Sequence, residues 1–331
     1  MSDQGPVLAQ PPRDVQAGKP QTEVSLTRVG VRGVEKVIRV GGKLFFAEME
    51  CFVDLHPQQA GVHMSRFEEI VNEAIAGAVE SQSMRAEELA AQVAEQVRER
   101  QAGLRAEVSI QAHYPETVTA PESGTPSQEI YKLHGTAVAS ERGTRTLTGV
   151  EAHGMTACPC AQEELAVRAR KRLEADGFEP GEIERIFDAV PVATHNQRGI
   201  GELHLGRPEG VEVVIDAPDL LHIVEQSMSS EIYELMKRND EASVVEKAHR
   251  NPRFVEDVVR EMVRAVAEAY PGLRDGGFLL ARQENLETIH RHTVVAERSG
   301  LISEVLDEIA TGAHSRHHMT QREWLEAPVA P

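Results

Sequence analysis

Runs of alternating apolar and polar residues, the pattern of half-buried β-strands, occur in pairs along this chain of 331 residues. Two runs rich in β-branched residues, 25–40 and 43–55, flank Gly41-Gly42, so they predict a β-hairpin with a two-residue turn. A helical stripe begins after Ser65, and a second covers about 85–101. Strand patterns then return, which gives the first half of the chain the order ββααββ.

The second half shows the same order with additions. Strands are predicted at 202–206 and 211–215, followed by a long helix over about 218–237 and two further helices. Two more strands are predicted at 277–285 and 291–297. The chain contains no strong sequence repeat, so the repetition lies in the order of elements alone.

Composition excludes several classes of function. A formal net charge of −18 and an aromatic content of 4% argue against a broad nucleic-acid-binding face. No run of about 18 apolar residues is present, so we expect no membrane span. The N-terminal residues lack the apolar core of a signal peptide, and three cysteines are too few for a disulfide framework. The composition therefore predicts a cytoplasmic protein.

Cys158-Pro159-Cys160 contains two of the three cysteines. Proline favours an extended preceding residue, and side chains two apart in an extended segment point to the same side. Both sulfurs are therefore predicted to face one pocket. Simple burial of two small side chains is the alternative. A structural zinc site is disfavoured, because C-x-C is not the usual ligand spacing and a second cysteine pair is absent from the sequence.

Two other short segments are rich in metal-ligand and acid/base residues, namely Thr194–Arg198 and Glu287–His292, and Glu246 is a further candidate. Thiolate, imidazole and carboxylate together suit a divalent transition metal, and three protein ligands leave a position open for water. Each segment taken alone is also explained by histidines that stabilise the scaffold. The combination of the segments is what favours a site.

A separate candidate lies at the predicted N-terminus of the first helix. Ser65 and Glu68 have the spacing of a capping box, which places His63 and Arg66 beside free backbone N–H groups that attract anions. A surface arginine and a loop histidine are the alternative. In the polar C-terminal segment, His314, His317 and His318 are either metal ligands or incidental residues.

Five motifs taken together resemble the type IB GTP cyclohydrolases, a family that includes the archaeal-type MptA branch. They are Gly61–Phe67, Cys158–Cys160, His195–Arg198, Asn251–Asp257 and Glu287–His292. The resemblance covers about residues 25–300. The residues that follow the cysteine pair, and a long insert before His195, are more similar to the MptA branch.

The resemblance implies an α+β tunnelling fold, with two ββααββ modules per chain and antiparallel sheets that join across subunits. It also implies a homotetramer with active sites at subunit interfaces. The expected division of the chain is a disordered N-terminal lead at 1–22, a first module at 23–155, a second module at 156–305 with a helical insert at 161–188, and a flexible C-terminal tail at 306–331.

The resemblance further implies roles for individual residues. One divalent ion per site, Fe2+, Mn2+ or Zn2+, is expected on the ligands Cys158, His195 and Glu246. The implied catalytic residues are Cys158, Glu287, His290 and His292. The implied substrate-binding residues are His63, Ser65, Arg66 and Arg198 for the triphosphate, with either Glu256 or Glu261 for the guanine edge.

The implied activity is hydrolysis of the guanine imidazole ring of GTP at C8 with release of formate. The main prediction for the product is 7,8-dihydroneopterin triphosphate, at the first step of folate and pterin biosynthesis. The alternative is the MptA-type product, 7,8-dihydroneopterin 2′,3′-cyclic phosphate, with pyrophosphate released. Two other classes stay open, a tunnelling-fold nitrile reductase with a covalent cysteine and a metal-binding protein. A disulfide between Cys158 and Cys160 also stays open.

Overall fold

The computed structural model describes residues 16, 18–40, 43–80 and 85–327. Most of the predicted N-terminal lead, the turn at Gly41-Gly42 and residues 328–331 therefore lie outside the described residues. The described strands form one antiparallel sheet in the order β1-β2-β3-β4-β5-β6-β8-β9, and β7 pairs with β5. The strands are β1 Leu26–Val40, β2 Lys43–Leu55, β3 Arg105–Thr119, β4 Pro126–Ser140, β5 Gly143–Ala157, β6 Asn196–Arg207, β7 Ser230–Glu231, β8 Phe278–Leu286 and β9 Val294–Leu301.

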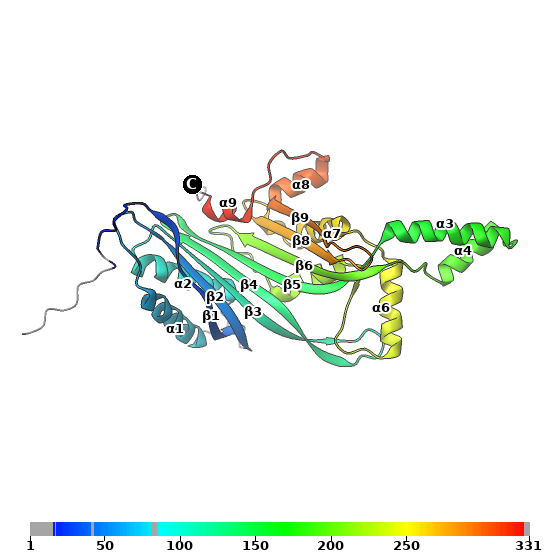
Figure 1. Ribbon diagram of the computed structural model, residues 1–331, viewed down its shortest axis with the longest axis horizontal. Coiled ribbons are helices and arrows are strands. Elements are labelled where there is room, and N and C mark those ends of the chain that lie inside the picture. The colour runs from blue at the N-terminus through cyan, green and yellow to red at the C-terminus, as the bar shows by residue number, and fades with distance from the viewer. Residues whose placement is uncertain (1–15, 17, 41–42, 81–84, 328–331) are drawn as a thin grey trace, which may run out of the picture.

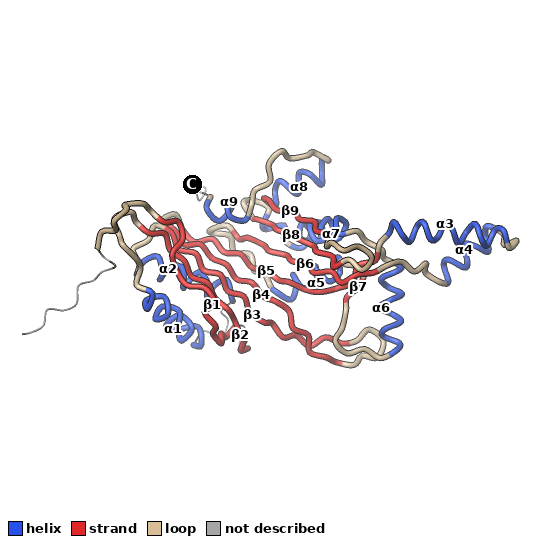
Figure 2. The backbone as a smooth tube through the Cα atoms, viewed as in Figure 1, coloured by secondary structure: helices blue, strands red, loops and turns tan. Residues whose placement is uncertain are grey.

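Helices pack on this sheet or extend from its ends. They are α1 Met64–Glu80, α2 Ala86–Arg100, α3 Pro159–Ala175, α4 Pro180–Ala189, α5 Ala217–Ser227, α6 Arg238–Arg250, α7 Val255–Ala269, the short 3-10 helix Pro271–Leu273, α8 Ile302–Thr311 and α9 Gln321–Glu326. Figure 1 shows α3 and α4 projecting from one end of the sheet, and Figure 2 shows how the strands run side by side across the molecule. Among the described residues, no helix is long and apolar enough to cross a membrane.

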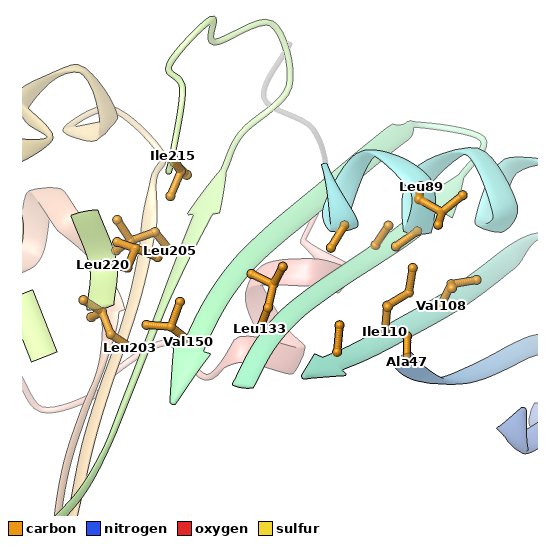
Figure 3. Packing of buried hydrophobic residues seen from close by; sticks show 14 of the residues in the cluster. Ala47, Leu89, Val108, Ile110, Leu133, Val150, Leu203, Leu205, Ile215 and Leu220 are labelled. Carbon is orange, nitrogen blue, oxygen red and sulfur yellow. The ribbon is translucent and has the colours of Figure 1, made fainter. Parts of the chain in front are cut away.

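One continuous apolar core joins the two halves of the chain. Alternate residues of each strand point to the helices, as Met49 and Cys51 of β2 do, and both are fully buried. Leu89 of α2 lies over Val108 and Ile110 of β3 in Figure 3, and this packing belongs to the same cluster that α5 and α7 cover farther along the sheet. The alternation of the sequence therefore determines which face of the sheet the helices cover.

The structure confirms a mixed protein with a large antiparallel sheet, and it confirms the first predicted hairpin. β1 pairs with β2 in antiparallel fashion up to Val40 and Lys43. The elements of the first half follow the order β1, β2, α1, α2, β3, β4. β4 continues the sheet into the second half through its pairing with β5, from Lys132 and Glu151 to Ser140 and Gly143.

Three local predictions are wrong. Residues 211–215 form no strand, although Ile215 is buried, because the described sheet offers them no partner. The long helix predicted over 218–237 ends at Ser227, since β7 pairs with β5 and this long-range pairing overrides the local helical pattern. Helix α1 begins at Met64, so Ser65 lies inside its first turn rather than at a cap.

The C-terminal segment differs from the flexible tail predicted at 306–331. Trp324 of α9 is 1% exposed and stacks on Phe278 of β8 with 5.6 Å between ring centroids. Gly206 makes room for this ring, because a Cβ atom there would lie 2.7 Å from it. Arg145 covers the indole at 5.0 Å. A single large aromatic residue thus anchors a polar segment, on the face of the sheet opposite the main core.

Replacing Trp324 with alanine is expected to lower the free energy of unfolding by about 3–5 kcal/mol, because it removes a buried indole and leaves a cavity beside Gly206. Denaturant unfolding of the purified variant measures this change. Trp324→Phe serves as the control and should lose less than half as much. A loss below about 1 kcal/mol in the alanine variant, the range of exposed positions, would contradict the anchoring role.

Candidate functional site

Three strands end close together at one end of the sheet. Ala157 at the end of β5 pairs with Asn196 at the start of β6, and Arg198 of β6 pairs with Leu286 at the end of β8. Cys158, His195 and Glu287 directly extend these strands, so the register of the sheet brings all three segments together. We refer to this part of the molecule, defined by Cys158, His195 and Glu287, as the Cys158 end.

The side chains at the Cys158 end form an acid/base cluster. His195 Nδ1 lies 3.8 Å from Glu287 Oε2, and the two side chains are 13% and 8% exposed. Neither atom has a hydrogen-bond partner among the described residues. The rings of His195 and His290 lie 6.5 Å apart and perpendicular, and those of His290 and His292 stack at 5.3 Å. This set can hold and transfer protons near a bound ligand.

Cys158 is held through its backbone. Its N–H donates to the carbonyl oxygen of His195 at 3.1 Å, and the hydroxyl of Thr194 donates to the carbonyl oxygen of Cys158 at 2.9 Å. The prediction that both sulfurs lie in one extended segment is wrong, because Pro159 starts helix α3 and carries Cys160 into it. The Cys158 thiol is half-buried and that of Cys160 is exposed, and both are free thiols.

The third predicted metal ligand lies elsewhere in the single chain. Glu246 of α6 forms an ion pair with Arg250 at 2.7 Å, and its side chain is 54% exposed. No group of three or more histidine, cysteine, aspartate or glutamate side chains among the described residues is placed to hold a metal ion. The set of Cys158, His195 and Glu246 therefore stays a prediction.

The residue types at the Cys158 end nevertheless suit a divalent ion. The buried atoms His195 Nδ1 and Glu287 Oε2 lack hydrogen-bond partners among the described residues, so the imidazole nitrogen is available to a cation and the carboxylate oxygen to a proton. The half-buried thiol of Cys158 adds a soft donor close by in the chain. An imidazole nitrogen and a thiol sulfur with a carboxylate nearby form a donor set typical of zinc, iron or manganese.

Sequence reasoning missed one carboxylate beside this end. Glu231 of β7 pairs with Gly154 of β5, four residues before Cys158. Burial is the largest single influence on Glu231 and would raise its pKa, but the hydrogen bond from Lys247 at 2.6 Å, the charge of Lys247 and further hydrogen bonds together lower that pKa. The carboxylate is therefore held ionised. It was missed because it fell inside the long helix predicted over 218–237, and the three serines at 227, 229 and 230 were the only local signal against that helix.

Beneath the Cys158 end the core turns polar. Gln197, Gln283 and Thr156 are almost fully buried, and each has one oxygen without a hydrogen-bond partner among the described residues. Gly199 and Gly201 allow this layer to pack, because a Cβ atom at either position would collide with Gln283. Buried polar groups of this kind usually bind ordered water.

The predicted anion-binding residues lie around a cavity of about 590 Å3, which we call the α1 cavity. Its lining includes His63, Arg66, Arg100 and Gln101. His63 directly precedes α1, and the side-chain amide of Gln101 donates to the carbonyl oxygen of His63 at 2.9 Å. Arg66 lies in the first turn of α1 and donates to the carbonyl oxygen of Arg100 at 3.2 Å. Ser65 is exposed beside them. A helix N-terminus with two arginines suits an anionic group.

The two groups of predicted residues lie at opposite ends of the strands. β3 begins at Arg105, beside the α1 cavity, and Arg105 pairs with Ser140 next to the start of β5. β5 then runs for 15 residues to Ala157 and the Cys158 end. A strand of that length spans roughly 45 Å, so one chain does not bring His63 or Arg66 to Cys158.

The remaining predicted residues, Arg198, Glu256 and Glu261, lie at different distances from the Cys158 end. Arg198 of β6 pairs with Met155 of β5 and is exposed there. Helix α7 starts near the same end, since the N–H of Arg253 donates to the carbonyl oxygen of Ala157 at 3.0 Å. Glu256 lies in its exposed first turn. Glu261 lies farther along, and its hydrogen bond with Arg264 lowers its pKa.

Comparison with known proteins identifies a matching family model, related sequences and similar structures. The sequence model of the type I GTP cyclohydrolase folE2 family matches residues 13–296. The chain is 41% identical over 307 residues to the GTP cyclohydrolase MptA of Methanococcus aeolicus, covering 89% of this chain and 99% of that protein. It is 38% identical over 306 residues to the GTP cyclohydrolase MptA of Methanocaldococcus jannaschii, covering 89% and 97%. Among solved structures, uricase from Arthrobacter globiformis matches with a TM-score of 0.49 and 12% identity, over 89% of this chain and 96% of that one.

Proposed function

The chain belongs to the type I GTP cyclohydrolase folE2 family, and from this premise we propose that it converts GTP to 7,8-dihydroneopterin 2′,3′-cyclic phosphate, formate and pyrophosphate. The observation that carries this proposal is the similarity, at 38–41% identity over about nine-tenths of the chain, to proteins named GTP cyclohydrolase MptA. This favours the alternative product of the sequence analysis over the triphosphate product that was its main prediction. The nitrile reductase and the metal-binding protein gain no support from the family match.

The residues of the Cys158 end would carry out the hydrolysis. A divalent ion held by Cys158 and His195 would supply the Lewis acidity that activates water. Glu287 is placed to accept a proton, because its Oε2 is buried, unpaired among the described residues and 3.8 Å from His195. His290 and His292 are exposed beside it and can pass protons to the nitrogen atoms of the opening imidazole ring.

The phosphates would be bound by a second chain, at the end of its sheet where α1 begins. His63, Ser65 and Arg66 provide a helix N-terminus and a guanidinium, but they lie at the far end of β5 from Cys158. We therefore propose that the protein is a homo-oligomer, a tetramer of tunnelling-fold chains, in which each site combines the Cys158 end of one chain with the α1 end of another. Arg198 would meet the phosphates from the Cys158 side.

For the guanine edge, the structure favours one of the two predicted carboxylates. Glu261 is already paired with Arg264, whereas Glu256 is exposed in the first turn of α7 near the Cys158 end. A free carboxylate can accept two hydrogen bonds from the N1 and N2 positions of guanine. We propose Glu256 for this role.

Anaerobic incubation of the purified protein with GTP, with Fe2+, Mn2+ or Zn2+ added in turn, tests the proposed reaction. Formate, pyrophosphate and the phosphate content of the pterin product are measured together. Formate with equimolar pyrophosphate is the expected result. Formate with a triphosphate product would contradict this proposal and support 7,8-dihydroneopterin triphosphate, the main prediction of the sequence analysis. No formate with any of the three metals would overturn the proposed function.

A further inference from the structure

Three segments that carry predicted metal ligands meet around one side chain, Gln162 of α3. They are the start of α3 at Cys158, the loop that ends at His195, and helix α6, which carries Glu246. We propose that Gln162 is a positioning residue that fixes these segments relative to one another and so sets the geometry in which Cys158 and His195 receive a divalent metal ion. This inference rests on the proposed function for the presence of the metal.

The contacts of Gln162 join all three segments directly. Its side-chain nitrogen donates to the carbonyl oxygen of Val192 at 2.7 Å and to that of His249 at 2.6 Å. Val192 lies in the loop before β6, and His249 lies in the last turn of α6. A primary amide has two N–H groups, so these bonds use the whole donor capacity of Gln162.

A second set of bonds closes a ring around Cys158. Thr194 donates its hydroxyl to the carbonyl oxygen of Cys158 at 2.9 Å, and the N–H of Cys158 donates to the carbonyl oxygen of His195 at 3.1 Å. The Nε2 atom of His249, a residue only 6% exposed, lies 3.2 Å from the carbonyl oxygen of Thr194. These hydrogen bonds therefore connect Cys158 directly to Thr194 and His195, and His249 to Thr194.

Apart from its contacts with α4, among them the ion pair of Arg170 with Glu184, helix α3 has little else among the described residues to fix its direction. None of its residues, all of which the structure describes, is buried, and Figure 1 shows α3 and α4 projecting from the sheet. Packing therefore does little to orient the helix that begins at Cys158, and hydrogen bonds near its first turn must do so. Residues that orient metal ligands without touching the metal typically change metal affinity by about 10–100-fold when replaced.

The substitution Gln162→Glu tests the inference while keeping the shape of the side chain. A carboxylate cannot donate to the carbonyl oxygens of Val192 and His249, and it repels them. Zn2+ affinity of the metal-free, full-length protein is measured by competition with a chromophoric chelator. We expect the Kd for Zn2+ to rise by about 10–100-fold. At saturating metal, KM for GTP should stay within about twofold, because Gln162 bonds to Val192 and His249 and to none of the residues proposed to bind GTP.

Two further variants make the result decisive. Thr194→Val removes the hydroxyl that binds Cys158 without changing side-chain volume, and it should also weaken Zn2+ binding. Gln111→Glu makes the same charge change at an exposed position on β3 and should leave the Kd unchanged. If Gln162→Glu fails to fold, Gln162→Met, which lacks both N–H donors without adding a charge, takes its place in the same measurement.

The outcomes separate this inference from the proposed function. Unchanged Zn2+ affinity in a folded Gln162→Glu variant would overturn the positioning role, even if the wild-type protein releases formate from GTP. An equal loss of affinity in Gln111→Glu would overturn it too, because the effect would then follow net charge. A wild-type protein that binds no Zn2+ would overturn this inference together with the proposed metal site.

Discussion

Replacing Cys158 with alanine is expected to lower kcat/KM for formate release from GTP on the order of 10³-fold or more, the scale seen when a principal catalytic group is removed. Cys158 directly follows β5, and two hydrogen bonds to its backbone fix the residue beside His195. Without this thiol the proposed metal ion would lose its soft donor. A weakly held ion would no longer activate water. Formate release and metal content of the purified variant measure the effect.

Cys160→Ala is the matched control for this prediction. Cys160 lies two residues farther on, inside α3, with an exposed thiol. The control should keep activity and metal content close to those of the wild type. Full activity and normal metal content in Cys158→Ala, or an equal loss in both variants, would show that the site is assigned to the wrong cysteine.

Mixed oligomers of two inactive variants are expected to regain activity, to roughly a quarter of the wild-type level for random 1:1 association. The two variants are Cys158→Ala, which damages one end of the sheet, and Arg66→Ala, which removes the guanidinium at the other. A quarter of the sites would combine the intact Cys158 end of one chain with the intact α1 end of another. Co-expression with two affinity tags, tandem purification and formate assays measure this gain.

The control pairs two variants at the same end of the sheet. Cys158→Ala and His195→Ala lie in adjoining segments of one chain, so their mixed oligomers should show no gain over either variant alone. Activity in the first mixture but not in the second supports sites built from two chains. If neither mixture regains activity although mixed oligomers have formed, the proposal that the ends of different chains share a site is wrong.

Much of the Cys158 end was predictable because its residues lie next to strand ends. Strand patterns over 145–153 and 202–206 are clear in the sequence, and Cys158 and His195 follow or precede these strands. Neighbouring antiparallel strands bring such flanking residues together whatever the loop between them contains. The helical insert between Cys158 and His195 therefore did not obscure their proximity.

Sequence reasoning could not fix the surroundings of three other residues. Glu231 is fixed by two residues of β7 pairing with β5, a contact with no local pattern. Glu246 was chosen as a metal ligand by resemblance, but in the single chain Arg250, one helical turn away, holds its carboxylate. The separation of His63 from Cys158 became visible only with the strand register, because motif order in the sequence carries no information about distance.

The packing of Trp324 joins α9 to strands that lie much earlier in the sequence. This indole fills a slot between Gly206 of β6 and Phe278 of β8, so the slot stays open until α9 has been synthesised. A chain that ends early, by a premature stop or by proteolysis, would present an exposed aromatic patch there. Helix α9 therefore covers an aromatic surface that loss of this helix would expose to solvent.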